Sequence, residues 1–400
     1  MGPSRSLARV FRLVLLVLIA GLAVAYVALG ARQQWDFETY YYAGAAYRAG
    51  LNPYALDALS SVAGKTVELP FLYPPVTLAI FVPLSLLSIH LAAGLWLGLK
   101  SLLLVFLVWL WGREFLGGLG LTVLLSTTLL GFNLAVLWDL RTGNVAIIEA
   151  AILWLAFTNY IRRRLLLTAL LIALASAFKL LPILLLGVIA MSRQPAKVRL
   201  RWMAVGVAVL LTLVAWPTPL LPGSISALSS ASVGNRPYGD INPSALGMAD
   251  WFVSTIELPA SAGPVVSVML YLAYCAAILA SGLRILFREY ESDSRVDQVI
   301  SIVLLWLLLS PRVMVYSYVM AIVPVLYVVQ KRVQSLGWRA AAIALLLAEG
   351  IVRLLPGRPP AILGPLSFLL LLGAWLLWIR TPSTEGQGKA APCHSGSLVV

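Results

Sequence analysis

The sequence predicts an all-α polytopic membrane protein, and three observations lead to that prediction. Of the 400 residues, 61% are hydrophobic and only 11% charged, with a mean hydropathy of +0.93. One soluble core cannot hide that much apolar surface. The apolar residues fall into runs near the ~20 residues that a bilayer-crossing helix needs. The Lys and Arg residues lie in short clusters between these runs, a pattern that sets membrane orientation.

The composition also excludes several classes of function. A formal net charge of +13 would suit nucleic acid, but the clustering of basic residues between apolar runs indicates membrane orientation instead. The two cysteines, Cys275 and Cys393, form neither a disulfide framework nor a metal site. The two histidines, His90 and His394, are too far apart in sequence and context for a metal site or a Ser-His-Asp triad. No glycine loop of a phosphate-cradling type occurs and no soluble domain is large enough to hold one, so a nucleotide donor is not expected. No metal and no cofactor are expected either.

The first apolar run, about residues 10–30, is expected to stay as a helix, because it is too long for a signal peptide and no cleavage site follows. Three arginines within the first twelve residues place the N-terminus in the cytoplasm. The loop 31–73 would then be extracytoplasmic. It is rich in Tyr, Phe and Leu, which predicts short helices lying at the membrane interface.

The next segments are assigned by the positive-inside rule. Residues 74–90 are short and carry Pro83, which predicts a re-entrant or surface helix, with 91–111 as the second full span. Spans near 119–138 and 143–160 follow, joined by an outer loop from Asp139 to Asn144.

Residues 165–192 must leave and return to the cytoplasmic side, as two short helices broken around Lys179 to Pro182. A broken helix at membrane depth is tolerated where it faces protein or a water-filled cavity. We therefore expect Lys179 to face a cavity that opens outward.

A span near 202–218 leads into a second long extracytoplasmic loop, 217–263, whose length without periodicity is typical of a functional loop. Further spans, by length, fall near 264–287, 298–310, 313–330, 339–354 and 361–379. The sequence predicts one membrane-embedded domain over 1–380 with about twelve transmembrane helices and both termini cytoplasmic. The tail 381–400 is expected to be disordered.

Asp36 is the candidate general base. It directly follows the first span, where a helix end holds it in place and partial desolvation would raise its basicity toward a sugar hydroxyl. The alternative is that Asp36 ends the helix or pairs with Arg32. Glu38 would face differently in a helix and is the reserve candidate, or a solvated charge. Tyr40 begins a run of three tyrosines that fits an aromatic belt as well as sugar stacking.

Four basic residues lie in separate outer loops or helix ends: Arg141, Lys179, Arg236 and Arg312. Guanidinium groups bind phosphate oxygens bidentately and lysine adds a point charge, so the set would suit the phosphate of a lipid donor. The alternative is that these side chains snorkel to headgroups. Lys100, within a span, is expected to snorkel or to be paired inside the bundle.

Short motifs follow one another in a recognisable order. They are Asp36, Gly50-Leu51-Asn52-Pro53-Tyr54, Tyr73-Pro74-Pro75 with Pro83-Leu84, Gly143-Asn144, Lys179 with Pro182, Asn242-Pro243-Ser244 and Ser310-Pro311. In this order, over residues 35–324, the chain resembles the bacterial polyprenyl-phosphate-mannose-dependent mannosyltransferases. These are membrane glycosyltransferases of the GT-C fold.

The resemblance implies that Asp36 deprotonates an acceptor hydroxyl, which attacks the anomeric carbon with inversion while polyprenyl phosphate leaves. Positive charge from Lys179, Arg312 and Arg141 would stabilise that leaving group without a metal, an assignment that rests on charge alone. The expected substrate-binding residues are Glu38, Tyr40, Asn52, Tyr54, Tyr73, Asn144, Asn242, Tyr316 and Tyr318.

Two positions depart from the family pattern. Asn144 stands where relatives often carry Gln, and Arg312, Tyr316 and Tyr318 stand where many carry Trp and His. Both departures fall where the sugar or acceptor would be recognised, so the reaction class is predicted while the sugar stays open.

The predicted function is transfer of a hexose, mannose by the resemblance, from a polyprenyl-phosphate donor to a lipid-linked or cell-envelope glycan. The partners would be that donor, a glycolipid or glycan acceptor and membrane lipids. A transporter or flippase of polyprenyl-linked sugar is the alternative, since the same basic cavity would serve it. A structural subunit would leave the long polar outer loops unexplained.

Overall fold

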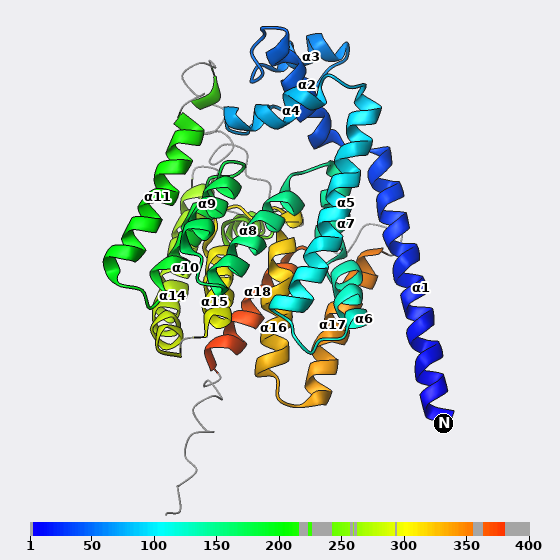
Figure 1. The fold of residues 1–400 in the computed structure, drawn as a ribbon, viewed down its shortest axis with the longest axis vertical. Coiled ribbons are helices and arrows are strands. Elements are labelled where there is room, and N and C mark those ends of the chain that lie inside the picture. Colours follow the sequence, from blue (N-terminus) through cyan, green and yellow to red (C-terminus); the bar gives the residue numbers. More distant parts are fainter. Residues whose placement is uncertain are drawn as a thin grey trace, which may run out of the picture.

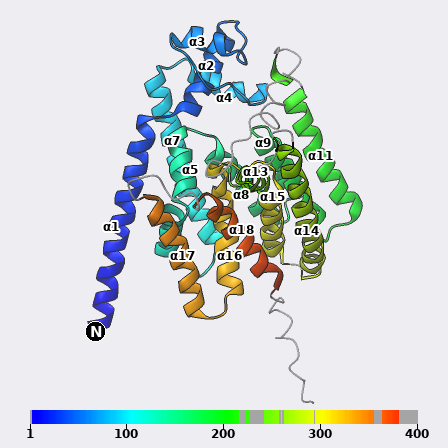
Figure 2. The same cartoon turned by 180° about the vertical axis from the view of Figure 1, so that it is seen from behind.

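The computed structural model describes residues 3–215, 223–225, 242–256, 259, 262–292, 294–354 and 363–380, and every regular element within them is helical. Figures 1 and 2 show a bundle with α1 (Pro3–Arg32) along one edge. The end away from the N-terminus is capped by α2 (Trp35–Arg48), α3 (Leu56–Ala63) and α4 (Leu78–Leu84). The expected short helices of the first outer loop are therefore present.

Four described helices are long and apolar enough to cross a membrane. They are α1 from Leu13, α5 (Ile89–Glu114), α11 (Ala196–Ala215) and α14 (Gly263–Ser292). They confirm the helices expected near 10–30, 91–111, 202–218 and 264–287. Several other expected spans are shorter apolar helices, so the total of about twelve crossings stays a prediction.

The segment expected as a straight span near 119–138 is bent. It consists of α6 (Leu121–Ser126), a π-helical stretch η2 (Thr127–Gly131) and α7 (Asn133–Thr142), with a 65° bend. A π-helical stretch interrupts the regular hydrogen-bond ladder and so accounts for a sharp kink.

The prediction of an outer loop from Asp139 to Asn144 is wrong over its first part. Asp139 and the three residues after it form the last turn of α7, and Gly143 ends the helix in the left-handed conformation, with φ of 75°. Glycine is the residue that adopts this conformation at least cost, so Gly143 marks the true helix end. The connection to α8 (Ala146–Ile161) is a tight turn.

The break expected around Lys179 is confirmed. The first helix, α9 (Leu165–Ser176), ends before Lys179, and the chain continues as η3 (Leu181–Leu186) and α10 (Gly187–Ala190). A similar break precedes α16 (Ile322–Arg332), where η6 (Val315–Ala321) replaces part of one expected span.

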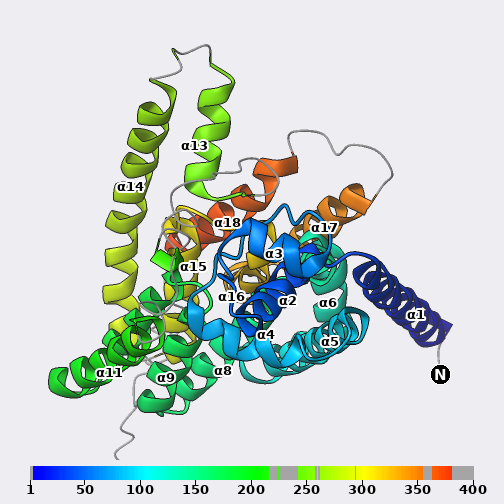
Figure 3. The same ribbon diagram turned by 90° about the horizontal axis from the view of Figure 1, so that it is seen from above.

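The remaining described helices are α13 (Ala245–Ser254), α15 (Arg295–Leu309), α17 (Leu336–Leu354) and α18 (Leu363–Arg380). The helices α13 and α14 extend to one side of the bundle (Figure 3). Only part of the expected outer loop 217–263, including α13, is described, and the tail 381–400 lies outside the described residues. The inner helices α8 and α15 are buried along most of their length, as expected of helices surrounded by protein.

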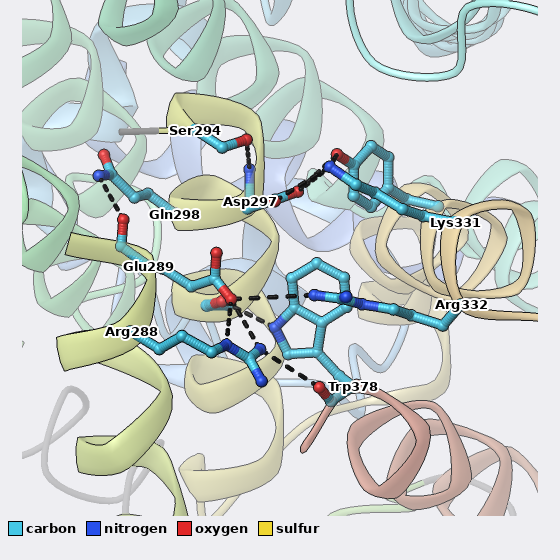
Figure 4. Close-up of polar contacts among 10 residues, drawn as sticks. Arg288, Glu289, Ser294, Asp297, Gln298, Lys331, Arg332 and Trp378 are labelled. Carbon is cyan, nitrogen blue, oxygen red and sulfur yellow. Dashed lines mark hydrogen bonds and ion pairs between the residues drawn. The ribbon is translucent and has the colours of Figure 1, made fainter. Parts of the chain in front are cut away.

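An ionic cluster joins four helices at the end of the bundle away from α2 (Figure 4). Glu289 of α14 is fully buried and contacts Arg288 at 2.6 Å and Arg332 of α16 at 3.9 Å. Asp297 of α15 contacts Lys331 at 3.1 Å. The Arg332 guanidinium lies 4.2 Å from the ring centroid of Trp378 in α18. We call this set the four-helix cluster.

Candidate active site

Asp36 lies in the first turn of α2, directly after the end of α1 at Arg32. Its Oδ2 accepts a hydrogen bond of 2.8 Å from Nδ2 of Asn144, which is 108 residues further along the chain and buried. Asp36 therefore begins a helix instead of ending one. The partnership with Asn144 joins α2 to the turn between α7 and α8.

Two tyrosines complete the cluster around Asn144. The Nδ2 atom of Asn144 lies 3.2 Å from Oη of Tyr40 and 3.3 Å from Oη of Tyr73, and the two tyrosine hydroxyls share a hydrogen bond of 2.8 Å. Tyr40 follows Asp36 by one helical turn, so both face the same side of α2. Three separate segments thus place polar groups around one carboxylate.

Local sequence explains why Asn144 is held there. A side chain at Gly143 would bring its Cβ to 2.6 Å from Cβ of Phe37, so glycine allows the turn to approach α2. Nε1 of Trp96 donates to the Gly143 carbonyl at 2.7 Å. The backbone N–H of Asn144 donates to Oγ1 of Thr142 at 3.1 Å. These contacts fix the Asn144 side chain against Asp36.

A buried ion pair supports the same turn. Nζ of Lys100 lies 2.9 Å from Oδ1 of Asp139, both side chains are fully buried, and Lys100 also donates to the Asp139 carbonyl. Oδ2 of Asp139 accepts the backbone N–H of Ile147 at the start of α8. The expectation that Lys100 is paired inside the bundle is confirmed. Asp139, expected in an open loop, is instead its partner.

Burial raises the pKa of the Asp36 carboxyl above its ordinary value. The hydrogen bond from Asn144 and the positive charge of Lys100 oppose this rise in pKa, because both stabilise the carboxylate. A carboxylate with a raised pKa and fixed orientation is suited to accept a proton.

Positive charge lies near Tyr316. Nζ of Lys179 lies 2.9 Å from Oε2 of Glu149 and 5.1 Å from the ring centroid of Tyr316. Tyr316 is close enough to Asp36, Tyr73 and Arg312 for their charges to interact with it. The structure therefore gathers Lys179, Arg312 and Tyr316 near the Asp36 cluster.

Glu149 was missed by the sequence reasoning. It is buried in α8, within an apolar run, and holds Lys179 in place. A carboxylate in such a run is expensive unless it is paired, which is the signal that would have found it.

Four other predicted site residues form hydrogen bonds between their side chains and backbone groups. The Asn52 side chain accepts the Tyr54 N–H at 3.0 Å, and Oη of Tyr54 donates to the Tyr73 carbonyl at 2.8 Å. Oδ1 of Asn242 accepts the Val313 N–H at 2.9 Å. Oη of Tyr318 donates to the Pro243 carbonyl at 2.6 Å. Asn52 and Tyr54 shape the loop beside Tyr73. The bonds of Asn242 and Tyr318 join residues 242–243 to the segment 313–318, which contains Tyr316.

Three predicted residues lie apart from this cluster or outside the described part. Arg141 donates to Gln33 at 2.9 Å and lies 5.8 Å from the ring of Trp35, beside the connection between α1 and α2. Glu38 lies on a different face of α2 from Asp36 and pairs with Lys65. Arg236 lies outside the described residues.

Comparison with known proteins gives a family. The model of glycosyltransferase family 87 matches residues 71–311, more than half of the chain and inclusive of Tyr73, Asn144 and Lys179. No curated protein and no solved structure matches the chain. The match includes Tyr73 and Asn144 of the cluster, whereas Asp36 and Tyr40 precede it. Because the family model covers more than half of the chain, the chain belongs to glycosyltransferase family 87.

Proposed function

We propose that the protein transfers a hexose, mannose first among the candidates, from a polyprenyl-phosphate donor to a hydroxyl of a lipid-linked or cell-envelope glycan on the extracytoplasmic face. The observation that carries this proposal is the hydrogen bond between Asp36 and buried Asn144, within a cluster that includes Tyr40 and Tyr73. The raised pKa of Asp36 supports its role as the base.

In the proposed reaction, a carboxylate oxygen of Asp36 removes the proton from the acceptor hydroxyl. The acceptor oxygen attacks the anomeric carbon of the donor sugar from the face opposite the phosphate. The bond between the anomeric carbon and the phosphate oxygen breaks, and polyprenyl phosphate leaves with the electron pair. Asn144 keeps the carboxylate oriented for this transfer, because its amide donates a hydrogen bond to one carboxylate oxygen.

Positive charge on the donor side would stabilise the leaving phosphate. Lys179 and Arg312 both lie near Tyr316, and fixed cations aimed at developing negative charge lower the barrier for phosphate departure. Exposed leucines of the broken segment adjoin Lys179 in sequence, at Leu180, Leu181 and Leu184. An apolar surface beside a phosphate-binding cation suits a donor with a long hydrocarbon chain.

The test is transfer by the full-length protein in lipid vesicles, with labelled polyprenyl-phosphate mannose, other polyprenyl-phosphate hexoses and a panel of glycolipid acceptors. We expect wild-type transfer and a loss of kcat of about 10²–10⁴-fold in Asp36→Asn, the usual contribution of a general base. Binding of the donor should change little, because Asp36 faces the acceptor. Asp57→Asn, an exposed carboxylate in α3, is the matched control.

Two results would contradict the proposal in different ways. Undiminished transfer by Asp36→Asn would remove Asp36 as the base. Wild-type protein that moves polyprenyl-linked sugar between leaflets but transfers none would instead indicate a flippase.

A further inference from the structure

A cleft lies on a different face of α2 from the Asp36 cluster. It has a volume of about 470 Å³ and is lined by Trp35, Glu38, Thr39 and Tyr42 of α2 and by residues 65–69. The helical residues follow the spacing i, i+3, i+4 and i+7, which defines one face of a helix. Asp36 and Tyr40 belong to a different face. We call this space the outer cleft.

The wall of the outer cleft is held in place at several points. Gly64 ends α3 in the left-handed conformation, with φ of 64°, and turns the chain toward α2. The Val67 N–H donates to Oγ of Ser60 in α3 at 3.0 Å. Nζ of Lys65 lies 2.8 Å from Oε2 of Glu38 and 5.9 Å from the ring centroid of Tyr42. The cleft is therefore formed before any ligand arrives.

The charge of the outer cleft differs from that of the donor side. Its lining holds two carboxylates, Glu38 and Glu68, and one ammonium group, Lys65. Negative charge in excess repels a phosphate group, whereas Lys179 and Arg312 near Tyr316 attract one. The outer cleft is thus unsuited to the phosphate of a polyprenyl donor or to an anionic lipid headgroup.

The remaining groups suit a neutral saccharide. Trp35 and Tyr42 line the cleft, and aromatic rings are surfaces against which the C–H groups of a sugar can pack. The Trp35 ring also contacts Trp138 and Arg141, which hold it in position. Carboxylates accept hydrogen bonds from sugar hydroxyls and lysine donates to them, and such charge-assisted bonds are the strong ones. A mostly preformed cavity with a few convergent polar groups is typical of small-molecule sites.

We propose that the outer cleft binds a neutral sugar unit of the acceptor glycan, at least one unit away from the hydroxyl that Asp36 deprotonates. This rests on the proposed function only in naming the glycan as the acceptor. A helix with its side chains is about 10–12 Å across, so an oligosaccharide can contact both faces at the start of α2. The cleft would make an extended acceptor bind better than a short one.

The first test measures equilibrium binding without catalysis. Full-length protein in phosphatidylcholine nanodiscs is titrated with mannotetraose, cellotetraose and chitotetraose, and binding is followed by isothermal calorimetry. We expect wild type to bind at least one tetrasaccharide saturably. The double variant Tyr42→Ala/Glu68→Ala should bind it at least tenfold more weakly. Asp57→Asn, a carboxylate outside the cleft, is the control.

Each contrary outcome of that titration overturns the proposal. Absence of saturable binding to all three tetrasaccharides would do so, as would equal binding by wild type and the double variant. Tighter binding of a terminally phosphorylated tetrasaccharide than of its neutral form would overturn the charge argument. Glu68 is exposed, so the single variant Glu68→Ala gives the same comparison if the double variant does not fold.

The second test separates this proposal from the proposed function. In the transfer assay, the ratio of KM for a tetrasaccharide lipid acceptor to KM for a monosaccharide lipid acceptor should rise about tenfold in Tyr42→Ala/Glu68→Ala. An unchanged ratio would overturn the proposal that the outer cleft binds the acceptor and would leave the proposed transfer reaction intact. A wild type that binds tetrasaccharide through the cleft but transfers no hexose contradicts the proposed function and leaves the cleft intact.

Discussion

Asp36 is subject to opposing influences that together set its proton affinity. Burial raises the pKa of its carboxyl, whereas the hydrogen bond from Asn144 and the charge of Lys100 lower it. The base must be unprotonated to act, so transfer should fall as the pH is lowered through the raised pKa. The acid limb of the rate profile is expected at higher pH than for an ordinary aspartate.

Asn144→Ala removes a hydrogen bond that favours the carboxylate form of Asp36. The pKa of Asp36 should therefore rise further, and the acid limb of kcat/KM should move up by about one pH unit, the lower end of what a bond to a charged group contributes. Asn159→Ala, at the other end of α8, is the matched control. An acid limb that stays in place would show that Asn144 does not stabilise the carboxylate.

The double variant Lys179→Gln/Glu149→Gln tests the donor side without leaving the buried Glu149 carboxylate unpaired. Loss of this positive charge should raise KM for the donor about tenfold, because one charge-assisted hydrogen bond contributes about 1.5–3 kcal/mol and Lys179 is partly exposed. KM for the acceptor should stay constant. Initial-rate kinetics with varied donor measure the effect, and normal donor kinetics would remove Lys179 from the phosphate site.

At the scale of single residues, the sequence predicted the candidate base and several neighbours but not their partners. Asp36 stands out because it follows the first span. Its partner Asn144 is 108 residues away, and helix periodicity carries no information about which turns meet. Glu149 and Asp139 were found as partners of Lys179 and Lys100 only in the structure, although burial of a charge in an apolar run demands a partner.

The helix α2 is the element that organises the site. One face carries Asp36 and Tyr40 toward the turn between α7 and α8, and another carries Trp35, Glu38 and Tyr42 toward the outer cleft. The turn approaches α2 closely because Gly143 has no side chain. The same glycine ends α7, so one residue sets both the helix boundary and the contact.

Gly143→Ala tests this contact. A left-handed alanine costs about 1–2 kcal/mol, and its Cβ would also lie 2.6 Å from Cβ of Phe37, so the turn must move. The variant should have a lower Tm and strongly reduced transfer. Gly50→Ala is a matched control, since Gly50 has φ of 71° but open space around it. Equal effects of the two substitutions would show that the contact with Phe37 is unimportant.

A second prediction at the scale of helices concerns the contribution of the four-helix cluster to stability. Glu289→Gln removes the buried carboxylate between Arg288 and Arg332 and should destabilise the protein by about 3–5 kcal/mol, as breaking a buried ion pair does. Thermal unfolding measures the loss. Glu114→Gln, in a pair with the exposed Arg162, should cost no more than about 1 kcal/mol. Similar Tm values for both variants would contradict the structural role of the cluster.

Across the whole molecule, hydropathy predicted where helices lie better than how straight they are. The four long apolar helices fall where the runs of apolar residues placed them. The π-helical stretch before α7 and the short helix η6 before α16 were missed, because apolar composition does not distinguish a continuous helix from a bent one. Membrane orientation was inferred from charge alone and calls for its own test.

Cysteine labelling tests that orientation. In a background of Cys275→Ser and Cys393→Ser, Glu68→Cys should react with a membrane-impermeant thiol reagent in intact cells, because its loop is predicted to be extracytoplasmic. Lys197→Cys, an exposed residue at the start of α11, should react only after permeabilisation. The reverse pattern would place the Asp36 cluster in the cytoplasm.

The buried pair of Lys100 and Asp139 has a consequence for biogenesis. During synthesis α5 leaves the ribosome before α7, so Lys100 reaches the membrane before its partner, 39 residues later. A lysine at the centre of an isolated helix raises the free energy of membrane insertion by about 2.5–3.5 kcal/mol. The apolar remainder of α5 must offset this cost. Arrival of α7 neutralises the lysine and closes the turn that presents Asn144. The order of membrane assembly and the completion of the Asp36 cluster are therefore coupled by a single ion pair.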